Sequence, residues 1–208
     1  KQQYQKKGVK KMSFKKNKVA ILHKTFPTYI LEIEDFISEQ QCKDILKKIK
    51  KNKKLLIKHK SFLGNATTSY KENNFLDKLD SSIKSSLLEA TKKYSELSGF
   101  KTYNELRGSW FNVQKKQSSL QKHSHPLSTI SGVLYIKCKK GSFNTYFFNP
   151  NPMLDFTDKS KNTELTSEWV SFTPKDRTLL IFPSWLQHGA NFTKNKSNER
   201  IVLSFNII

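Results

Sequence analysis

The chain has 208 residues, and its 38 Lys and Arg against 17 Asp and Glu give a formal net charge of +21. Hydrophobic residues at 36% and aromatic residues at 12% are too frequent for a disordered tail, so we expect a packed core. No apolar run reaches about 18 residues, which excludes a membrane-spanning helix, and no stretch is typical of a signal peptide. The two cysteines, Cys42 and Cys138, form no disulfide framework and indicate a reducing, cytoplasmic location.

The positive charge first suggests a nucleic-acid partner, because a basic chain gains affinity for phosphates through counterion release. However, 35 of the 38 basic residues are Lys and only three are Arg, and 18 of the Lys lie in residues 1–60. Specific nucleic-acid sites rely on Arg, whose planar fork binds phosphates and guanine edges. We therefore interpret the charge as a solvated basic surface, and nucleic-acid contact stays an alternative that only the net charge supports.

Residues 1–18 are polar and basic, and we predict a flexible arm without regular structure there. Residues 19–208 are then expected to form a single domain. Its first element is a strand over residues 26–33, which are rich in β-branched and aromatic side chains.

Two helices are predicted next. Ser38 and Gln41 have the spacing of a capping box, and this opens an amphipathic helix over residues 39–54. A second helix is expected over about residues 74–97, with Gly99 as its C-cap. Its apolar stripe consists of Leu76, Leu79, Ile83, Leu87 and Leu97.

After Gly99 the pattern changes to short apolar or alternating runs separated by turn residues. Six strands are predicted, over residues 109–113, 129–136, 142–148, 168–172, 178–182 and 201–208. The expected fold is mainly β with a helical annex, an α+β arrangement with its helical part at about residues 36–100 and a β-sandwich or barrel at about 107–208. Residues 149–161 are loop-like and are expected to form a lid.

Three of the five histidines lie in the β-rich half. His123 and His125 form an H-x-H pair, and His188 follows 63 residues later. On an extended segment, side chains two residues apart share a face, so the two imidazoles of the pair point the same way. A third histidine from a distant strand can complete a facial set of ligands for a transition metal and leave open positions.

Arg200 lies 12 residues after His188, at the start of the last predicted strand. Arginine is scarce in this chain, and its planar guanidinium can bind a carboxylate through two parallel hydrogen bonds, which Lys cannot do. We interpret Arg200 as a carboxylate-binding residue; an ordinary cation at the end of a strand is the alternative.

Several motifs together resemble the 2-oxoglutarate/Fe(II) oxygenases that are common in phage and marine bacterial genomes. The similarity covers most of residues 26–208 and is strongest over residues 107–208. The motifs that carry it are HSHP at residues 123–126, SGVLY at 131–135, LIFPSWLQH at 180–188, ERI at 199–201 and SFN at 204–206.

This resemblance implies a double-stranded β-helix, or jelly roll, flanked by N-terminal helices. By position, His123 is the first iron ligand and His188 the distal ligand, and Arg200 holds the far carboxylate of 2-oxoglutarate. Tyr135 resembles a tyrosine that donates to the same carboxylate, although plain core packing explains it equally well. Asn112 is placed to contact the cosubstrate, or it simply closes a turn.

The sequence departs from the family at the third ligand. The family usually has H-x-D, whereas this chain has His125, and no Asp or Glu occurs in residues 106–154. In one interpretation His125 is the third ligand; in the other it turns away and leaves a two-histidine site. We favour the first, because imidazole suits iron and the spacing places His125 correctly.

The activity that the resemblance implies is oxidation with Fe(II), 2-oxoglutarate and O₂, in which a substrate is hydroxylated and succinate and CO₂ are released. The substrate could be a protein side chain, a nucleobase or a small metabolite, and the enzyme would work in the cytoplasm of a cell or of a phage-infected host. Two interpretations stay open for its aromatic residues, the lining of the pocket or the core of the barrel: Phe143, Tyr146, Phe147, Phe148 and Trp185.

Two other classes of protein stay open. A cupin-type three-histidine metalloprotein also has an H-x-H motif, but Ser128 and Thr129 stand where its glutamate is expected and it has no special use for Arg200. A basic nucleic-acid-binding module without enzymatic activity is the other alternative.

Overall fold

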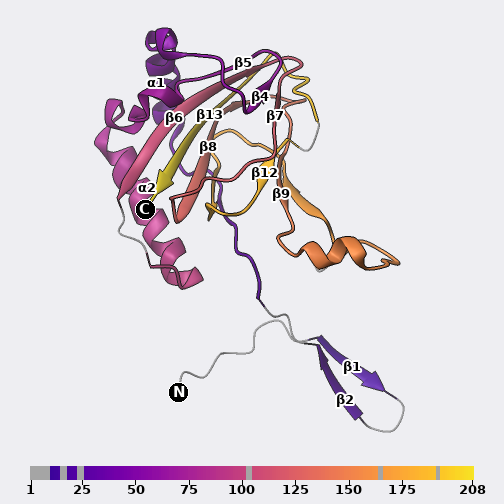
Figure 1. Cartoon of the computed structure of the whole chain (residues 1–208). Helices are drawn as coiled ribbons and strands as arrows, with labels where there is room; N and C mark the ends of the chain where they lie inside the picture. Colours follow the sequence, from indigo (N-terminus) through magenta and orange to yellow (C-terminus); the bar gives the residue numbers. More distant parts are fainter. Residues whose placement is uncertain (1–9, 15–17, 23–25, 102–104, 164–165, 191–192) are drawn as a thin grey trace.

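The computed structural model of the chain describes residues 10–14, 18–22, 26–101, 105–163, 166–190 and 193–208 (Figure 1). The helices are α1 (Glu39–Lys51), α2 (Ser81–Ser98) and the short 3₁₀ segments η1 (Lys53–Leu55), η2 (Tyr70–Glu72), η3 (Phe75–Lys78) and η4 (Pro152–Phe156). The strands are β1 (Lys10–Phe14), β2 (Lys18–Leu22), β3 (Leu31–Ile33), β4 (Phe62–Leu63), β5 (Ala66–Thr68), β6 (Leu106–Lys115), β7 (Ser119–Leu120), β8 (Ile130–Cys138), β9 (Thr145–Phe148), β10 (Trp169–Phe172), β11 (Leu179–Pro183), β12 (His188–Gly189) and β13 (Glu199–Ile207).

Two antiparallel sheets form the framework. The large sheet has the strand order β3-β11-β8-β13-β6-β5, and the small sheet has the order β10-β9-β12. Neighbours in the large sheet are far apart in sequence, as β13 lies between β6 and β8. The mainly β fold with N-terminal helices is as predicted, and each of the six predicted strands lies on an observed one with shifted ends.

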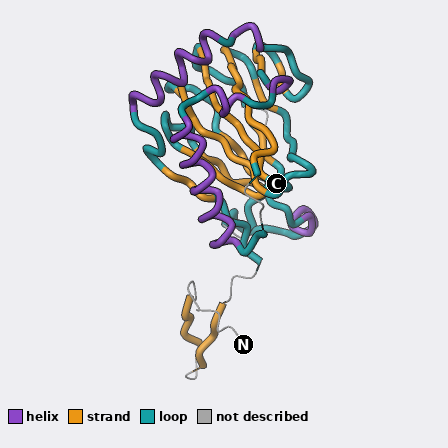
Figure 2. Tube along the Cα trace, turned by 90° about the vertical axis from the view of Figure 1, so that its left-hand side faces the viewer, coloured by secondary structure: helices purple, strands orange, loops and turns teal. Residues whose placement is uncertain are grey.

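The two faces of the large sheet have different partners. One face packs against α1 and α2, both of which lie on the same side of the strands (Figure 2). The other face packs against the small sheet, with Tyr135 and Val202 against Phe147 and Leu186. Because side chains alternate along a strand, β13 sends Ile201 and every second residue after it to the helices and the intervening residues inward.

Helix α1 begins as predicted. Ser38 accepts from the backbone N–H of Gln41 and the Gln41 side chain accepts from that of Ser38, so the capping box is formed. The helix ends at Lys51 and not at residue 54, and the 3₁₀ segment η1 follows it.

Helix α2 begins later than predicted. Asp80 caps it through the backbone N–H of Ser82, and the residues before it form the separate segment η3. Gly99 ends it in the left-handed conformation, φ 75°, as predicted. Leu97 was wrongly assigned to the apolar stripe, because it lies on the solvent side with 76% exposure, and Ala90 and Tyr94 continue the buried face.

The N-terminal expectations need correction. Within residues 1–18, which we predicted to be without regular structure, β1 pairs antiparallel with β2. The other residues of the arm, 1–9 and 15–17, lie outside the described part. The strand predicted over residues 26–33 is reduced to β3, because Phe26 has a positive φ of 55° and Pro27 has no backbone N–H for a ladder.

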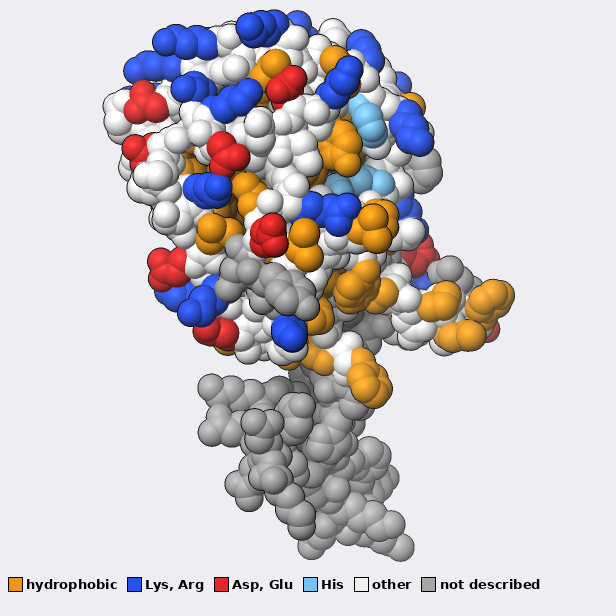
Figure 3. All heavy atoms as spheres, turned by 60° about the vertical axis from the view of Figure 1, so that its left-hand side comes forward, with side chains coloured by type: hydrophobic (Ala, Val, Ile, Leu, Met, Phe, Trp, Pro, Cys, Tyr) orange, Lys and Arg blue, Asp and Glu red, His pale blue; other side chains and the backbone are white. Residues whose placement is uncertain are grey.

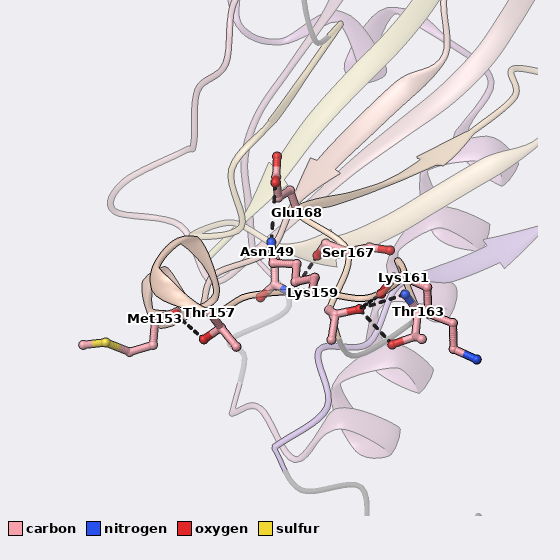
Figure 4. A network of polar contacts seen from close by, with 9 residues as sticks. Asn149, Met153, Thr157, Lys159, Lys161, Thr163, Ser167 and Glu168 are labelled. Carbon is pink, nitrogen blue, oxygen red and sulfur yellow. Dashed lines mark hydrogen bonds and ion pairs between the residues drawn. The ribbon is translucent and has the colours of Figure 1, made fainter.

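Residues 149–161 contain η4 and are tied to the start of β10. The Asn149 side chain donates to the Ser167 carbonyl at 3.0 Å, and the Lys159 ammonium lies 3.4 Å from Glu168 (Figure 4). No helix in the described part is long and apolar enough to cross a membrane.

Gly132 of β8 has no room for a side chain. It faces Phe205 across the ladder, and an added Cβ would overlap the buried Phe205 ring. We expect Gly132→Ala to lower the free energy of unfolding by about 1–3 kcal/mol, the usual cost of overpacking, as measured by chemical denaturation. Adding Phe205→Leu should relieve part of this loss, since it removes the overlapping atoms; strictly additive losses would contradict the packing explanation.

Candidate metal centre

Three histidines meet at one end of the space between the sheets. His123 and His188 form an antiparallel bridge, with backbone N–H to carbonyl distances of 3.0 and 2.9 Å, and the His125 N–H donates to the Ser184 carbonyl at 2.9 Å. Backbone hydrogen bonds therefore hold the H-x-H segment beside the distal histidine. The ligand atoms of the three rings lie within 4.8 Å of one another, so together they could hold a metal ion.

Hydrogen bonds to the backbone select the tautomer of two of these rings. His123 Nδ1 lies 2.8 Å from the Gln121 carbonyl, and His188 Nδ1 lies 2.9 Å from the Leu186 carbonyl. A carbonyl can only accept, so each Nδ1 carries the proton and each Nε2 keeps a free lone pair, as a metal ligand requires. The His125 ring has no such hydrogen bond to the described residues.

The three rings are neutral near pH 7. Burial lowers the pKa of His188 well below its ordinary value, and it also lowers the pKa of His123. Burial, followed by the effect of His123, lowers the pKa of His125 to about 3. Neutral imidazole is the form that binds a metal, so no proton has to leave these rings first.

Arg200 lies in the same cavity, at its inner end. Its side chain is only 2% exposed, and it donates through Nη1 to the Gln114 side chain and through Nη2 to the Thr145 hydroxyl at 3.2 Å. Its Nε is buried without a partner, and it forms no ion pair with the acidic residues of the described chain. A buried cation held only by neutral groups is costly unless an anion joins it.

Tyr135 lies behind Arg200 and does not line the cavity. Its hydroxyl hydrogen-bonds to the Thr145 hydroxyl at 2.7 Å, and burial raises its pKa to about 12. The Arg200 guanidinium lies 5.3 Å from the Tyr135 ring and 4.4 Å from the Phe143 ring. The Tyr135 hydroxyl is therefore linked to Arg200 through Thr145, while its ring lies directly beside the guanidinium.

Asn112 does line the cavity, on the inward face of β6. Its Nδ2 donates to the Ser204 hydroxyl at 3.1 Å, while its Oδ1 is buried without a partner. It does not close a turn, since it lies in the middle of the strand. An unpaired amide atom that faces a cavity is available to a ligand.

One cavity of about 410 Å³ connects the histidines with Arg200. Sequence reasoning missed several of its lining residues, among them Gln114, Thr145, Trp110 and His59. Gln114 is the register partner of Arg200, so only the pairing of β6 with β13 could have identified it.

For Phe143 and Phe147 the structure supports the alternative of core packing over an aromatic lining. None of the five aromatic residues named for it lines this cavity: Phe143 is buried against Arg200, Phe147 packs against the His188 ring, and Trp185 is 50% exposed. Phe148 contacts a Lys122 ammonium, and Tyr146 packs on Trp169.

The lid was placed over the wrong cavity. A second cavity, of about 680 Å³, lies beside the small sheet, and Asn149, Asn151 and Leu154 line it. None of the described residues between 149 and 161 lines the cavity of the three histidines. The loop is anchored along the edge strand β10, which directs it away from the metal centre.

A known protein family matches the jelly-roll part of the chain. Residues 108–206 match the model of a family described as "Putative 2OG-Fe(II) oxygenase". No curated protein sequence matches the chain.

Solved structures share the fold at low sequence identity. The viral collagen prolyl hydroxylase of Paramecium bursaria Chlorella virus 1, in complex with 2-oxoglutarate, is 16% identical, with 86% of this chain and 95% of that chain covered and a TM-score of 0.57. HygX of Streptomyces hygroscopicus, with nickel and 2-oxoglutarate bound, is 9% identical with 86% and 82% covered and a TM-score of 0.56. The carbocyclase SnoK from nogalamycin biosynthesis is 9% identical with 86% and 79% covered and a TM-score of 0.60.

These matches confirm the predicted double-stranded β-helix with flanking N-terminal helices. Fe(II) and 2-oxoglutarate are the cofactors that the family's description names, and the three neutral histidines and the buried Arg200 fit them. Over its jelly-roll part, residues 108–206, the chain therefore matches the family described as "Putative 2OG-Fe(II) oxygenase".

Proposed function

We propose that this chain is a 2-oxoglutarate- and Fe(II)-dependent hydroxylase, in which His123, His125 and His188 hold the iron. Arg200 binds the far carboxylate of 2-oxoglutarate. The observation that carries the proposal is Arg200 itself, a buried cation that faces the cavity of the three histidines without an acidic partner in the described chain.

The donor set suits this assignment. Imidazole nitrogens are good ligands for Fe(II), and His123 and His188 both present an unprotonated Nε2. Three neutral ligands leave the double positive charge of the ion uncompensated, and the 2-oxoglutarate dianion balances it. The His125 ring centroid lies 5.0 Å from that of His123 and 5.1 Å from that of His188, so the ring lies beside both. This supports His125 as the third ligand over a two-histidine site.

The inner end of the cavity is built to orient a carboxylate. Gln114 and Thr145 hold the guanidinium from two sides, and Tyr135 in turn holds the Thr145 hydroxyl. The buried Nε of Arg200 stays free for an incoming oxygen. Asn112 adds a second polar group on the path from Arg200 toward the histidines.

When bound, Fe(II), 2-oxoglutarate and O₂ supply the oxidation: a substrate C–H becomes C–OH while 2-oxoglutarate becomes succinate and CO₂. The residues of the chain hold the ion, orient the cosubstrate and keep the inner end dry. Phe182 and Val202 line the cavity and are almost fully buried, so they exclude water there.

The decisive test is turnover of the cosubstrate. The purified chain with Fe(II), ascorbate and O₂ should convert 2-oxoglutarate to succinate and CO₂, slowly in the absence of substrate, as measured by NMR of the reaction mixture. A chain that binds iron firmly but forms no succinate would favour the cupin-type alternative, which also accounts for three histidine ligands.

The role of His125 can be tested by restoring the family's usual ligand. His125→Asp should keep or raise the affinity for Fe(II), because a carboxylate ligates iron and adds a compensating charge. His188→Ala is the matched comparison and should lower the affinity for Fe(II) by more than about 100-fold. Loss of only the hydrogen-bond partner of a metal ligand already lowers metal affinity by up to about 100-fold, and this variant loses the ligand itself. Iron content after anaerobic dialysis measures both. Equal loss of iron in the two variants would favour a two-histidine site.

The role of Arg200 is tested by removing its fork while keeping its charge. Arg200→Lys should raise the KM for 2-oxoglutarate by roughly 10- to 100-fold, the cost of losing a charge-assisted hydrogen-bond pair. Arg177→Lys is the control, because Arg177 forms a surface ion pair with Asp35 at 2.7 Å and does not line the cavity. An unchanged KM in a folded Arg200→Lys variant would contradict the assignment.

A further inference from the structure

The cavity of the metal centre has an unusual selection of charged residues. Two of the chain's three arginines, Arg107 and Arg200, line it, whereas none of the described lysines and no described acidic residue does. Lysines outnumber arginines 35 to 3 in the whole chain, so a random choice of cations would give the opposite result. Arg200 is assigned to the cosubstrate, which leaves Arg107 without a function.

An irregularity of the sheet directs Arg107 to the cavity. In the ladder between β6 and β13, Gly108 pairs with Asn206 and Leu106 pairs with Ile207, so Arg107 has no partner opposite it. Such a bulge changes the direction of a side chain. Arg107 is exposed, and its Nη1 donates to the Leu127 carbonyl at the outer end of the cavity. It forms no ion pair with an acidic group of the described chain.

A series of ring contacts leads from His59 to the metal centre. We call it the aromatic wall; it consists of His59, Tyr70 and Trp110. The His59 and Tyr70 centroids are 5.6 Å apart, those of Tyr70 and Trp110 are 4.9 Å apart, and Trp110 lies 5.8 Å from the His125 ring. All three members line the cavity. Figure 3 shows histidine side chains at the surface with basic and hydrophobic side chains around them.

His59 differs from the metal-binding histidines in its tautomer. The backbone N–H of Ser61 donates to His59 Nδ1 at 3.2 Å, so the neutral ring carries its proton on Nε2. In His123 and His188 the arrangement is reversed, since Nδ1 donates to a carbonyl. His59 in this tautomer is therefore a hydrogen-bond donor through Nε2, and it is not a further metal ligand.

With Fe(II) and 2-oxoglutarate bound, the cavity would have an excess of positive charge. Fe(II) and the 2-oxoglutarate dianion cancel, and the three ligands are neutral. Arg107 and Arg200 then leave two positive charges in a cavity without an acidic lining residue in the described chain. A substrate with a negative charge would offset this excess, and a carboxylate or phosphate group matches the guanidinium fork.

We propose that the outer half of this cavity binds the anionic group of a small organic substrate, with Arg107 as its ionic partner and His59 as a second donor. The aromatic wall packs against the unsaturated or apolar part of the same molecule. This inference rests on the proposed function, because only an oxygenase would use this cavity to bind a substrate. The anion-binding residues can nevertheless be tested without turnover.

The test compares matched anionic and neutral probes. Benzoate, phenyl phosphate and benzamide are titrated by calorimetry into the full chain with Fe(II) and excess 2-oxoglutarate, under nitrogen. One or both of the anions should bind more tightly than benzamide by about tenfold or more, because a charge-assisted hydrogen bond contributes at least this factor to the affinity. The Kd of that anion should rise with the salt concentration. The tighter of the two anions identifies a carboxylate or a phosphate as the preferred group.

Variants distinguish the contributions of Arg107 and His59 to anion binding. Arg107→Gln should remove the preference for anions, while Arg177→Gln should leave it unchanged. His59→Phe keeps a ring in the aromatic wall and should weaken anion binding by about three- to tenfold; His59→Gln keeps a donor and should restore most of it. Benzamide affinity should respond little to Arg107→Gln and to His59→Phe, which shows that the cavity stays intact.

Several outcomes would overturn the proposal. These are failure of both anions to bind, equal affinity for benzoate and benzamide, or an unchanged anion affinity in Arg107→Gln. Anion binding that is lost in Arg200→Gln but not in Arg107→Gln would place the probe at the cosubstrate position and would also contradict it. Failure of the proposed function is distinguishable, because it appears as absent succinate formation while anion binding through Arg107 persists.

Discussion

The buried, unpaired charge of Arg200 is the constraint on which the rest of the site depends. A guanidinium at 2% exposure is stable only if polar groups surround it, and here Gln114 and Thr145 do so while no acid of the described chain approaches it. Neutral acceptors compensate a cation only in part. The free protein therefore keeps a cationic position ready in the cavity, at a cost in stability that a bound anion would reduce.

The alternation of β13 allows this charge to coexist with a well-packed core. Ile201, Leu203, Phe205 and Ile207 pack toward the helices, while Arg200, Val202, Ser204 and Asn206 line the cavity. One strand thus supplies both the hydrophobic face that holds the helices and the polar face of the site. The helical annex makes no direct contribution to the cavity through α1 or α2; it seals the far side of the sheet so that the inward face can be polar.

The parts of the site that were predictable depend on local sequence. The H-x-H pair points one way because of the period-two alternation of extended chain, and Arg200 was identifiable because arginine is rare here. Gln114 and Thr145 were not predictable, because their proximity to Arg200 depends on strand register and on packing between sheets. Register is a property of the assembled sheet and is not encoded in the composition of any one strand.

The same distinction explains the errors in the fold. The capping box and the C-cap glycine act within a few residues, so both were located correctly. Leu97 has the spacing of a buried residue, but it is exposed in the last turn of α2. The aromatic residues near β9 could have faced either the metal cavity or the second cavity. Their side chains are similarly apolar on both faces, so hydrophobicity carried no information about direction.

Replacing an acidic ligand by His125 changes the electrostatics of the whole cavity. A carboxylate ligand would cancel one positive charge beside the iron, and its absence leaves that charge to be balanced by whatever binds. The total of +21 is dominated by lysines, and none of the lysines in the described part lines the cavity. Charge that is buried or confined is screened far less than charge on the surface. The proposed substrate site therefore depends on two arginines and a missing carboxylate, and not on the many lysines of the chain.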